Sequence, residues 1–208
     1  MEPIKSYLAT GCLTATFVGR VPTFRKLDKI ASEDVAVKYG VASNTGRYWK
    51  YALQCDELDK VRAITAAMRI KFYEKTSSWG REGVRILPTE MYTGTLKREG
   101  YCDIFRNDYY LWKDAVNKFI AAYPALLLEA PNQLRGMYNP NDYPDISTIR
   151  DKFEVSLHVG PMPTVGDFRI EMAEEQLQDL KDKLTKQLET AQRESLKDLW
   201  NRLYERVE

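Results

Sequence analysis

The C-terminal segment constrains the fold of this chain more than any other part. Residues 170–207 contain neither glycine nor proline, and large apolar residues recur there every three or four positions. This spacing predicts one amphipathic helix, about 55 Å long at a rise of 1.5 Å per residue. Such a helix must bury its apolar stripe against another long element or a second subunit. We call this stripe the leucine seam, formed by Leu177, Leu180, Leu184, Leu188, Leu199 and Leu203.

Two further segments have helical spacing. Residues 47–75 place apolar side chains three or four apart and predict a helix of about 28 residues. A second helix is expected to begin at Phe105 or Asn107 and to run to Ala122. The Tyr123-Pro124 pair is expected to end it, because proline lacks an amide donor and disfavours a helical residue before it. Antiparallel packing of such helices predicts a helical arm.

Two segments have the period of two that is typical of strands. One is residues 8–18 and the other is residues 153–159, which Gly160-Pro161 ends. We expect these strands to pair at the base of the arm, and residues 79–100, which are rich in glycine, to form a long irregular loop. The predicted class is α+β, mainly helical. We expect a core domain with a helical hairpin over residues 1–169 and the amphipathic helix over 170–208.

Charge and cysteine content exclude several classes of protein. The chain has 31 Lys and Arg against 30 Asp and Glu, so it lacks the basic excess of a protein that coats polyanions. Cys12, Cys55 and Cys102 are isolated and odd in number, which fits a reducing cytoplasm and excludes a C-x-x-C metal or redox motif. We expect neither a secretory signal nor a membrane-spanning helix.

No catalytic motif stands out. The one histidine, His158, alternates with apolar residues and is expected on the polar face of its strand. Neither a phosphate-binding loop nor a dinucleotide fingerprint is present. Glu57-Leu58-Asp59-Lys60 resembles a fragment of a metal-dependent nuclease, but its helical context favours a solvated face. We therefore expect no enzymatic activity, no cofactor and no metal.

The segment from Trp79 to Tyr92 has the strongest functional pattern. Trp79, Arg81, Arg85 and Tyr92 combine aromatic and guanidinium groups on a predicted loop. Such residues form hot spots in protein interfaces, and they also stack bases and contact phosphates in single-strand binders. A third interpretation is structural, with the apolar side chains closing the end of the helical hairpin. The sequence leaves all three open.

An ordered set of short motifs resembles an uncharacterised domain family found largely in bacteriophage and prophage genomes. The resemblance covers roughly residues 8–170. Its motifs are Phe17-Val18-Gly19-Arg20, Ala66 to Phe72, Ser78-Trp79-Gly80, Ile86-Leu87-Pro88, Phe119 to Pro124, Met137-Tyr138-Asn139, Asp142-Tyr143-Pro144, Phe153-Glu154-Val155, Pro161-Met162-Pro163 and Asp167-Phe168-Arg169.

The resemblance implies which kind of protein this chain binds, and it implies no reaction. Members are similar in gene context to metal chelatase systems, beside MoxR-type AAA+ ATPases and von Willebrand-A-like proteins, and no catalytic residue can be transferred from them. We expect a non-enzymatic phage protein in the host cytoplasm that self-assembles and binds an AAA+ machine or a host-defence component. The alternative is a single-stranded nucleic-acid-binding protein of phage DNA metabolism.

Overall fold

The computed structural model describes residues 11–79 and 83–163, and twelve separate positions between 178 and 200. The chain divides into two compact units, each built from separate stretches of sequence. Unit 1 comprises Met1–Val18, Met68–Asn107 and Ser156–Glu208, and unit 2 comprises Gly19–Ala67 and Asp108–Val155. Two long helices, α3 (Asp56–Lys75) and α5 (Tyr101–Leu134), each contribute residues to both units.

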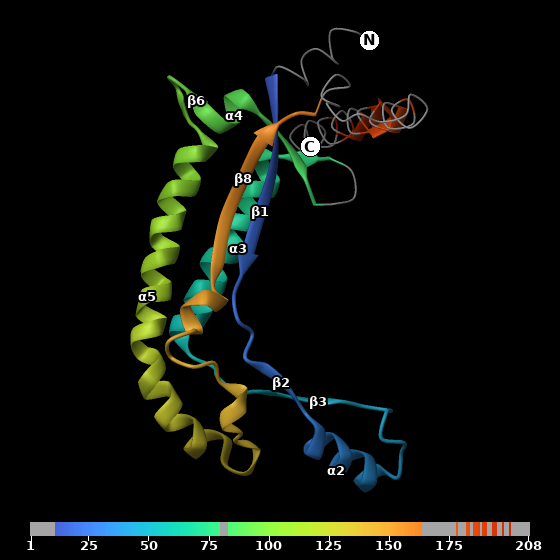
Figure 1. Cartoon of the computed structure of the whole chain (residues 1–208), viewed down its shortest axis with the longest axis vertical. Coiled ribbons are helices and arrows are strands. Elements are labelled where there is room, and N and C mark those ends of the chain that lie inside the picture. The colour runs from blue at the N-terminus through green and yellow to red at the C-terminus, as the bar shows by residue number, and fades with distance from the viewer. Residues whose placement is uncertain are drawn as a thin grey trace. The chain divides into compact units, whose positions relative to one another are not determined.

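Unit 1 contains most of a four-stranded sheet with the order β4-β5-β1-β8. The strands are β4 (Ser77–Ser78), β5 (Arg85–Pro88), β1 (Cys12–Arg20) and β8 (Glu154–Pro161). β5 pairs antiparallel with both β4 and β1, and β8 runs opposite to β1 in Figure 1. The predicted pairing of the first and last strands is therefore confirmed, although they lie about 140 residues apart in the chain.

Apolar residues on the two faces of this sheet form two buried clusters. Cys12, Trp79, Ile86 and Met162 form one, and Ala15, Phe72, Leu87 and Tyr101 form the other. The two clusters follow the alternation of β1 and β5, since Cys12 and Ile86 point to the face opposite Ala15 and Leu87. β1 therefore carries buried side chains on both of its faces, Cys12 on one and Ala15 on the other.

The core of unit 2 is aromatic. Phe119 and Tyr123 on α5 are fully buried, and the Phe119 ring lies 5.3 Å from that of Phe153 and 6.1 Å from that of Phe24. Tilted contacts at these distances add to the free energy of area burial. Short 3-10 helices follow α5 at Arg135–Met137, Pro140–Asp142 and Ile149–Lys152.

The predicted helix over residues 47–75 is wrong in its first part. Residues 48–51 form strand β3 (Tyr48–Tyr51), which pairs with β2 (Arg25–Asp28), and α3 begins at Asp56. Tyr48 and Tyr51 are three residues apart, which matches helical spacing, whereas the strand places Trp49 and Tyr51 on one face. The hydrogen bonds of the β2 ladder decide between the two.

The expected end of the second helix at Pro124 is also wrong, because α5 continues through Pro124 and Pro131 to Leu134. A proline inside a helix costs about 3 kcal/mol through its missing donor and its ring. Burial of Phe119, Tyr123 and Ala130 along this helix offsets that cost.

The segment over residues 79–100 is not an irregular loop. It contains β5, a short helix α4 (Thr89–Thr93), and the paired strands β6 (Gly94–Thr95) and β7 (Arg98–Glu99). Its glycines permit close backbone approach, since a Cβ on Gly94 would lie 2.5 Å from the Gly100 nitrogen. Gly94 and Gly100 therefore belong to a tight hairpin, where their lack of a side chain is required.

The fold is mixed α/β, with long helices and a small antiparallel sheet. The leucine seam from Leu177 to Leu203 lies outside the described residues, as does Arg81, so both remain sequence predictions. Among the described helices, none is long and apolar enough to cross a membrane.

Candidate interaction surfaces

A segment of unit 2, residues 25–51, forms a module that the sequence did not predict. It consists of β2, the helix α2 (Lys29–Tyr39) and β3 (Figure 1). Asp28 caps α2, because its carboxylate accepts a hydrogen bond from the Ala31 amide at 3.0 Å. Gly40 ends the helix in the left-handed conformation, with φ of 64°. The antiparallel register then places Leu27 opposite Trp49 and Asp28 opposite Tyr48.

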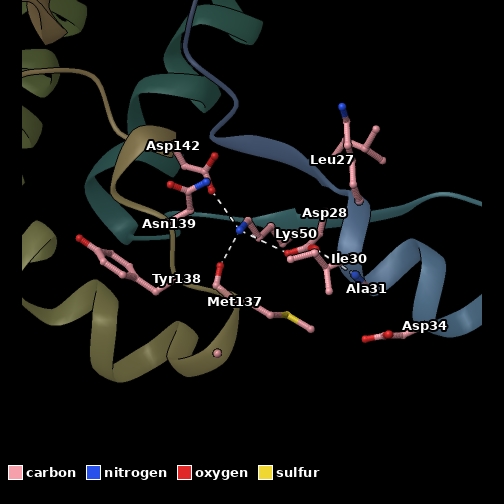
Figure 2. A pocket seen from close by; sticks show the side chains of 12 residues that line it. Leu27, Asp28, Ile30, Ala31, Asp34, Lys50, Met137, Tyr138, Asn139 and Asp142 are labelled. Atoms are coloured by element: carbon pink, nitrogen blue, oxygen red, sulfur yellow. Dashed lines mark hydrogen bonds and ion pairs between the residues drawn. The ribbon is translucent and has the colours of Figure 1, made fainter.

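Lys50 anchors one face of this ribbon. Its Nζ lies 3.0 Å from Asp142 Oδ2 and 3.3 Å from Asp28 Oδ2, and it donates a hydrogen bond to the Met137 carbonyl at 2.5 Å (Figure 2). The Lys50 side chain is 8% exposed. The ribbon is therefore fastened through Lys50 to the segment that follows α5.

The electrostatics keep this lysine charged. Burial alone lowers the pKa of Lys50, but the hydrogen bonds and charges of Asp142 and Asp28 outweigh it and raise the pKa. The hydrogen bond from the Ala31 amide lowers the pKa of Asp28, and Lys50 lowers it further against the effect of burial. A protonated, fully bonded ammonium is neither a nucleophile nor a general base. Although a cavity of about 460 Å³ adjoins it, the Lys50 cluster is a structural anchor.

The opposite face of the ribbon is aromatic and exposed. Strand alternation places Arg25, Leu27, Trp49 and Tyr51 on this face, which we call the ribbon face. Trp49 is 41% and Tyr51 49% exposed, and the Arg25 guanidinium carbon lies 4.9 Å from the centroid of the Trp49 ring. This arrangement is a cation–π contact between diagonal neighbours on two strands.

A second exposed surface is an apolar groove between α3 and α5 in unit 2. Its volume is about 710 Å³. Ala63 and Ile64 line it from α3, and Leu111 and three alanines line it from α5. Charged residues on both helices, including Glu57, Lys60, Asp114 and Lys118, form its rim. Small side chains along a groove allow close approach of a third helix.

The structure gives Trp79 and Arg85 roles in the packing of unit 1. Trp79 is buried with Cys12, Ile86 and Met162, which favours the structural interpretation over a surface contact. Arg85 donates from Nε to the Thr76 hydroxyl at 2.6 Å and from Nη2 to the Thr76 carbonyl at 2.8 Å, and it lies over the Tyr73 ring. These bonds satisfy the C-terminal end of α3.

Tyr92 is half-buried against the cluster around Phe72, and its pKa is raised by a hydrogen bond with Cys102 and by burial. His158 is exposed, as expected, with its ring nitrogen 3.1 Å from the Ser156 hydroxyl. In the part of the chain that the structure describes, no three His, Cys, Asp or Glu side chains lie close enough to hold a metal. Among the predicted site residues that the structure describes, Trp79 and Tyr92 thus pack in different clusters and do not form one surface.

Two signals pointed to the ribbon. The turn-rich run Ser43-Asn44-Thr45-Gly46 marks a break in the chain, and the aromatic residues Tyr48, Trp49 and Tyr51 that follow it are enriched in strands. A turn followed by such a run favours a short strand. The helical spacing of residues 47–75 masked it.

The structure is therefore that of a mixed α/β protein with two exposed surfaces, the aromatic ribbon face and the apolar groove. In comparisons with protein families, curated proteins and solved structures, nothing matches this chain.

Proposed function

We propose that this chain is a non-enzymatic binding protein that acts through protein–protein contact and self-assembles. The observation that carries the proposal is the α3/α5 groove, an exposed apolar channel on two helices of unit 2. Leu111 in this groove is 62% exposed. Contiguous apolar surface of this kind marks interaction sites.

The leucine seam supplies a partner of fitting chemistry. The groove contains four alanines, so it needs large side chains from its occupant to fill it. The first four leucines of the seam, Leu177 to Leu188, span twelve residues, as do Leu111 to Ala122 along the groove. The helix predicted for the seam would therefore match the groove in length, at about 16 Å for eleven steps of 1.5 Å. Insertion of the seam of one copy into the groove of another would bury both.

The resemblance to the phage domain family supports a second partner in the host cytoplasm. An AAA+ ATPase or a host-defence component fits a binding protein without catalytic residues. A groove that accepts a helix can serve this partner as well as a second copy, since both present amphipathic helices.

Light scattering coupled to size-exclusion chromatography tests self-assembly. We expect the full chain to be an oligomer, and a chain truncated after Arg169 or carrying Leu184→Glu to be a monomer. Leu111→Glu is expected to have the same effect, because it places a charge inside the groove.

Tyr110→Glu is the matched control. Tyr110 is also 62% exposed and is the neighbour of Leu111 on α5, but it does not line the groove. We expect it to leave the oligomer intact. The proposal is contradicted if the full chain is strictly monomeric. It is also contradicted if Leu111→Glu and Tyr110→Glu reduce assembly equally.

A further inference from the structure

The ribbon face carries two aromatic rings at a spacing that suits successive nucleobases. Trp49 and Tyr51 are two residues apart on β3, so their side chains leave the same face about 7 Å apart at the rise of an antiparallel strand. Both rings are exposed by more than 40%. Aromatic side chains on a sheet surface are the usual platform on which single-stranded bases stack.

The Arg25 guanidinium lies over one face of the Trp49 ring. Arg25 packs over it at 4.9 Å, from the position diagonal to it across the ladder. The guanidinium keeps the indole oriented and brings a positive charge to the edge of the platform. Arginine planes contribute to the binding of single strands in the same way.

A cationic pocket of about 290 Å³ adjoins the platform. Leu27 belongs both to the ribbon face and to the lining of this pocket. Lys29 and Arg47 bring two positive charges to the pocket, Ser43 adds a hydroxyl, and Glu33 is its one carboxylate. Neither Lys29 nor Arg47 forms an ion pair in the described part of the chain.

The opposite face of the ribbon makes the platform rigid. Lys50 fastens that face to Asp142 and the Met137 carbonyl, and it also neutralises Asp28 beside the pocket. The Trp49 and Tyr51 rings therefore project from a strand that is already held in place, so binding costs little conformational entropy.

We propose that the ribbon face and its adjoining pocket bind single-stranded nucleic acid. Trp49 and Tyr51 stack two successive bases, and Lys29 and Arg47 contact a phosphate next to them. The lining of the pocket favours a polyanion over a protein surface, because it holds two cations, Lys29 and Arg47, against one carboxylate, Glu33, and Arg25 adds a positive charge at the Trp49 ring. This site is separate from the proposed groove, and neither depends on the other.

Fluorescence anisotropy of the full chain with a labelled thymidine oligonucleotide of about 15 nucleotides tests the proposal. We expect binding at about 50 mM salt that weakens steeply as salt rises. Trp49→Ala and Tyr51→Ala are each expected to weaken binding about tenfold, since stacking contributes about 1–3 kcal/mol per base. Arg47→Ala is expected to weaken binding and to reduce the salt slope by about 0.7.

Two variants separate stacking from folding. Tyr39→Ala removes an exposed aromatic ring of α2 that is not on the ribbon face, and it is expected to bind as the wild type does. Trp49→Phe keeps a stacking ring and is expected to retain most of the affinity. Absence of binding at low salt overturns the proposal, and so does equal affinity of Trp49→Ala and the wild type, which would place any nucleic-acid binding elsewhere.

Discussion

The indole Nε1–H of Trp112 donates a hydrogen bond to Thr65 Oγ1 at 3.1 Å inside unit 2. The Thr65 hydroxyl in turn donates to the Val61 carbonyl one turn earlier in α3, at 2.8 Å. Trp112 and Thr65 are both 6% exposed. This chain of two bonds satisfies the polar groups at the contact of α3 with α5, so the apolar surfaces around them pack without a desolvation penalty.

Thr65→Val tests this relationship. Valine has nearly the same shape as threonine but leaves the buried Trp112 N–H without an acceptor, which costs about 1–3 kcal/mol. We expect the urea midpoint, followed by circular dichroism, to fall accordingly with an unchanged slope.

Thr65→Ser is the control for that substitution. Serine keeps the hydroxyl that accepts from Trp112 and loses one methyl group, so the expected loss is about 1 kcal/mol or less. If both variants lose the same stability, the hydrogen bond is not what holds this contact.

Lys50→Met tests the anchor of the ribbon. Removal of the ammonium leaves the carboxylates of Asp28 and Asp142, which are 11% and 14% exposed, without their cation. Breaking a buried pair by removing one partner costs about 3–5 kcal/mol, and the partial exposure here favours the lower end. Hydrogen exchange of the amides in residues 25–51 is expected to accelerate.

Lys26→Met is the matched control, because Lys26 is the cross-strand partner of Lys50 and is exposed. Its effect on exchange is expected to be small. Unchanged exchange in Lys50→Met would show that the ribbon is held by other contacts.

The pH dependence follows from the lowered pKa of Asp28. A carboxyl whose folded pKa is depressed stabilises the folded state above its ordinary pKa, near 3.9, and that contribution is lost as pH falls through the folded pKa. Lys50, with a raised pKa, stays charged throughout this range. We therefore expect unfolding free energy to fall between about pH 5 and pH 2.

Asp28→Asn isolates that contribution. Asparagine caps helices as well as aspartate does, so the bond to the Ala31 amide is retained and the charge is removed. Denaturant titrations at several pH values are expected to give a smaller acid dependence for this variant. An unchanged acid dependence would assign the effect to other carboxyl groups, such as Asp145, whose pKa is also lowered.

The sequence predicted those parts of the fold that one local pattern decides. The alternation at residues 153–159 identified β8, and its pairing with β1 followed from there being few other strands to pair with. Residues 48–51 could not be assigned locally, because the three-residue spacing of Tyr48 and Tyr51 matches a helix and only the ladder with Arg25–Asp28 makes this run a strand. Pro124 failed as a helix end for a similar reason, since the burial of Phe119 and Tyr123 is tertiary.

The site residues were harder to predict for a physical reason. Trp49 and Trp79 are the same residue type beside basic neighbours, yet one is 41% exposed and the other is buried. Composition cannot separate a surface platform from a core contact, because a tryptophan stabilises either. The difference arises from the sheet, whose pairing of Ile86 with Thr14 buries the cluster around Trp79.

Trp79→Ala distinguishes these roles by measurement. The side chain fills the cluster of Cys12, Ile86 and Met162, and its amide donates to the Val84 carbonyl at 3.1 Å. Truncation of a buried tryptophan costs about 3–5 kcal/mol, because it removes the transfer free energy and leaves a cavity. We expect a large fall in the unfolding free energy, whereas Trp49→Ala, at a surface position, is expected to change it by less than about 1 kcal/mol. If Trp79→Ala folds with wild-type stability, Trp79 is not a core residue, and the partner-binding interpretation of the segment from Trp79 to Tyr92 regains its support.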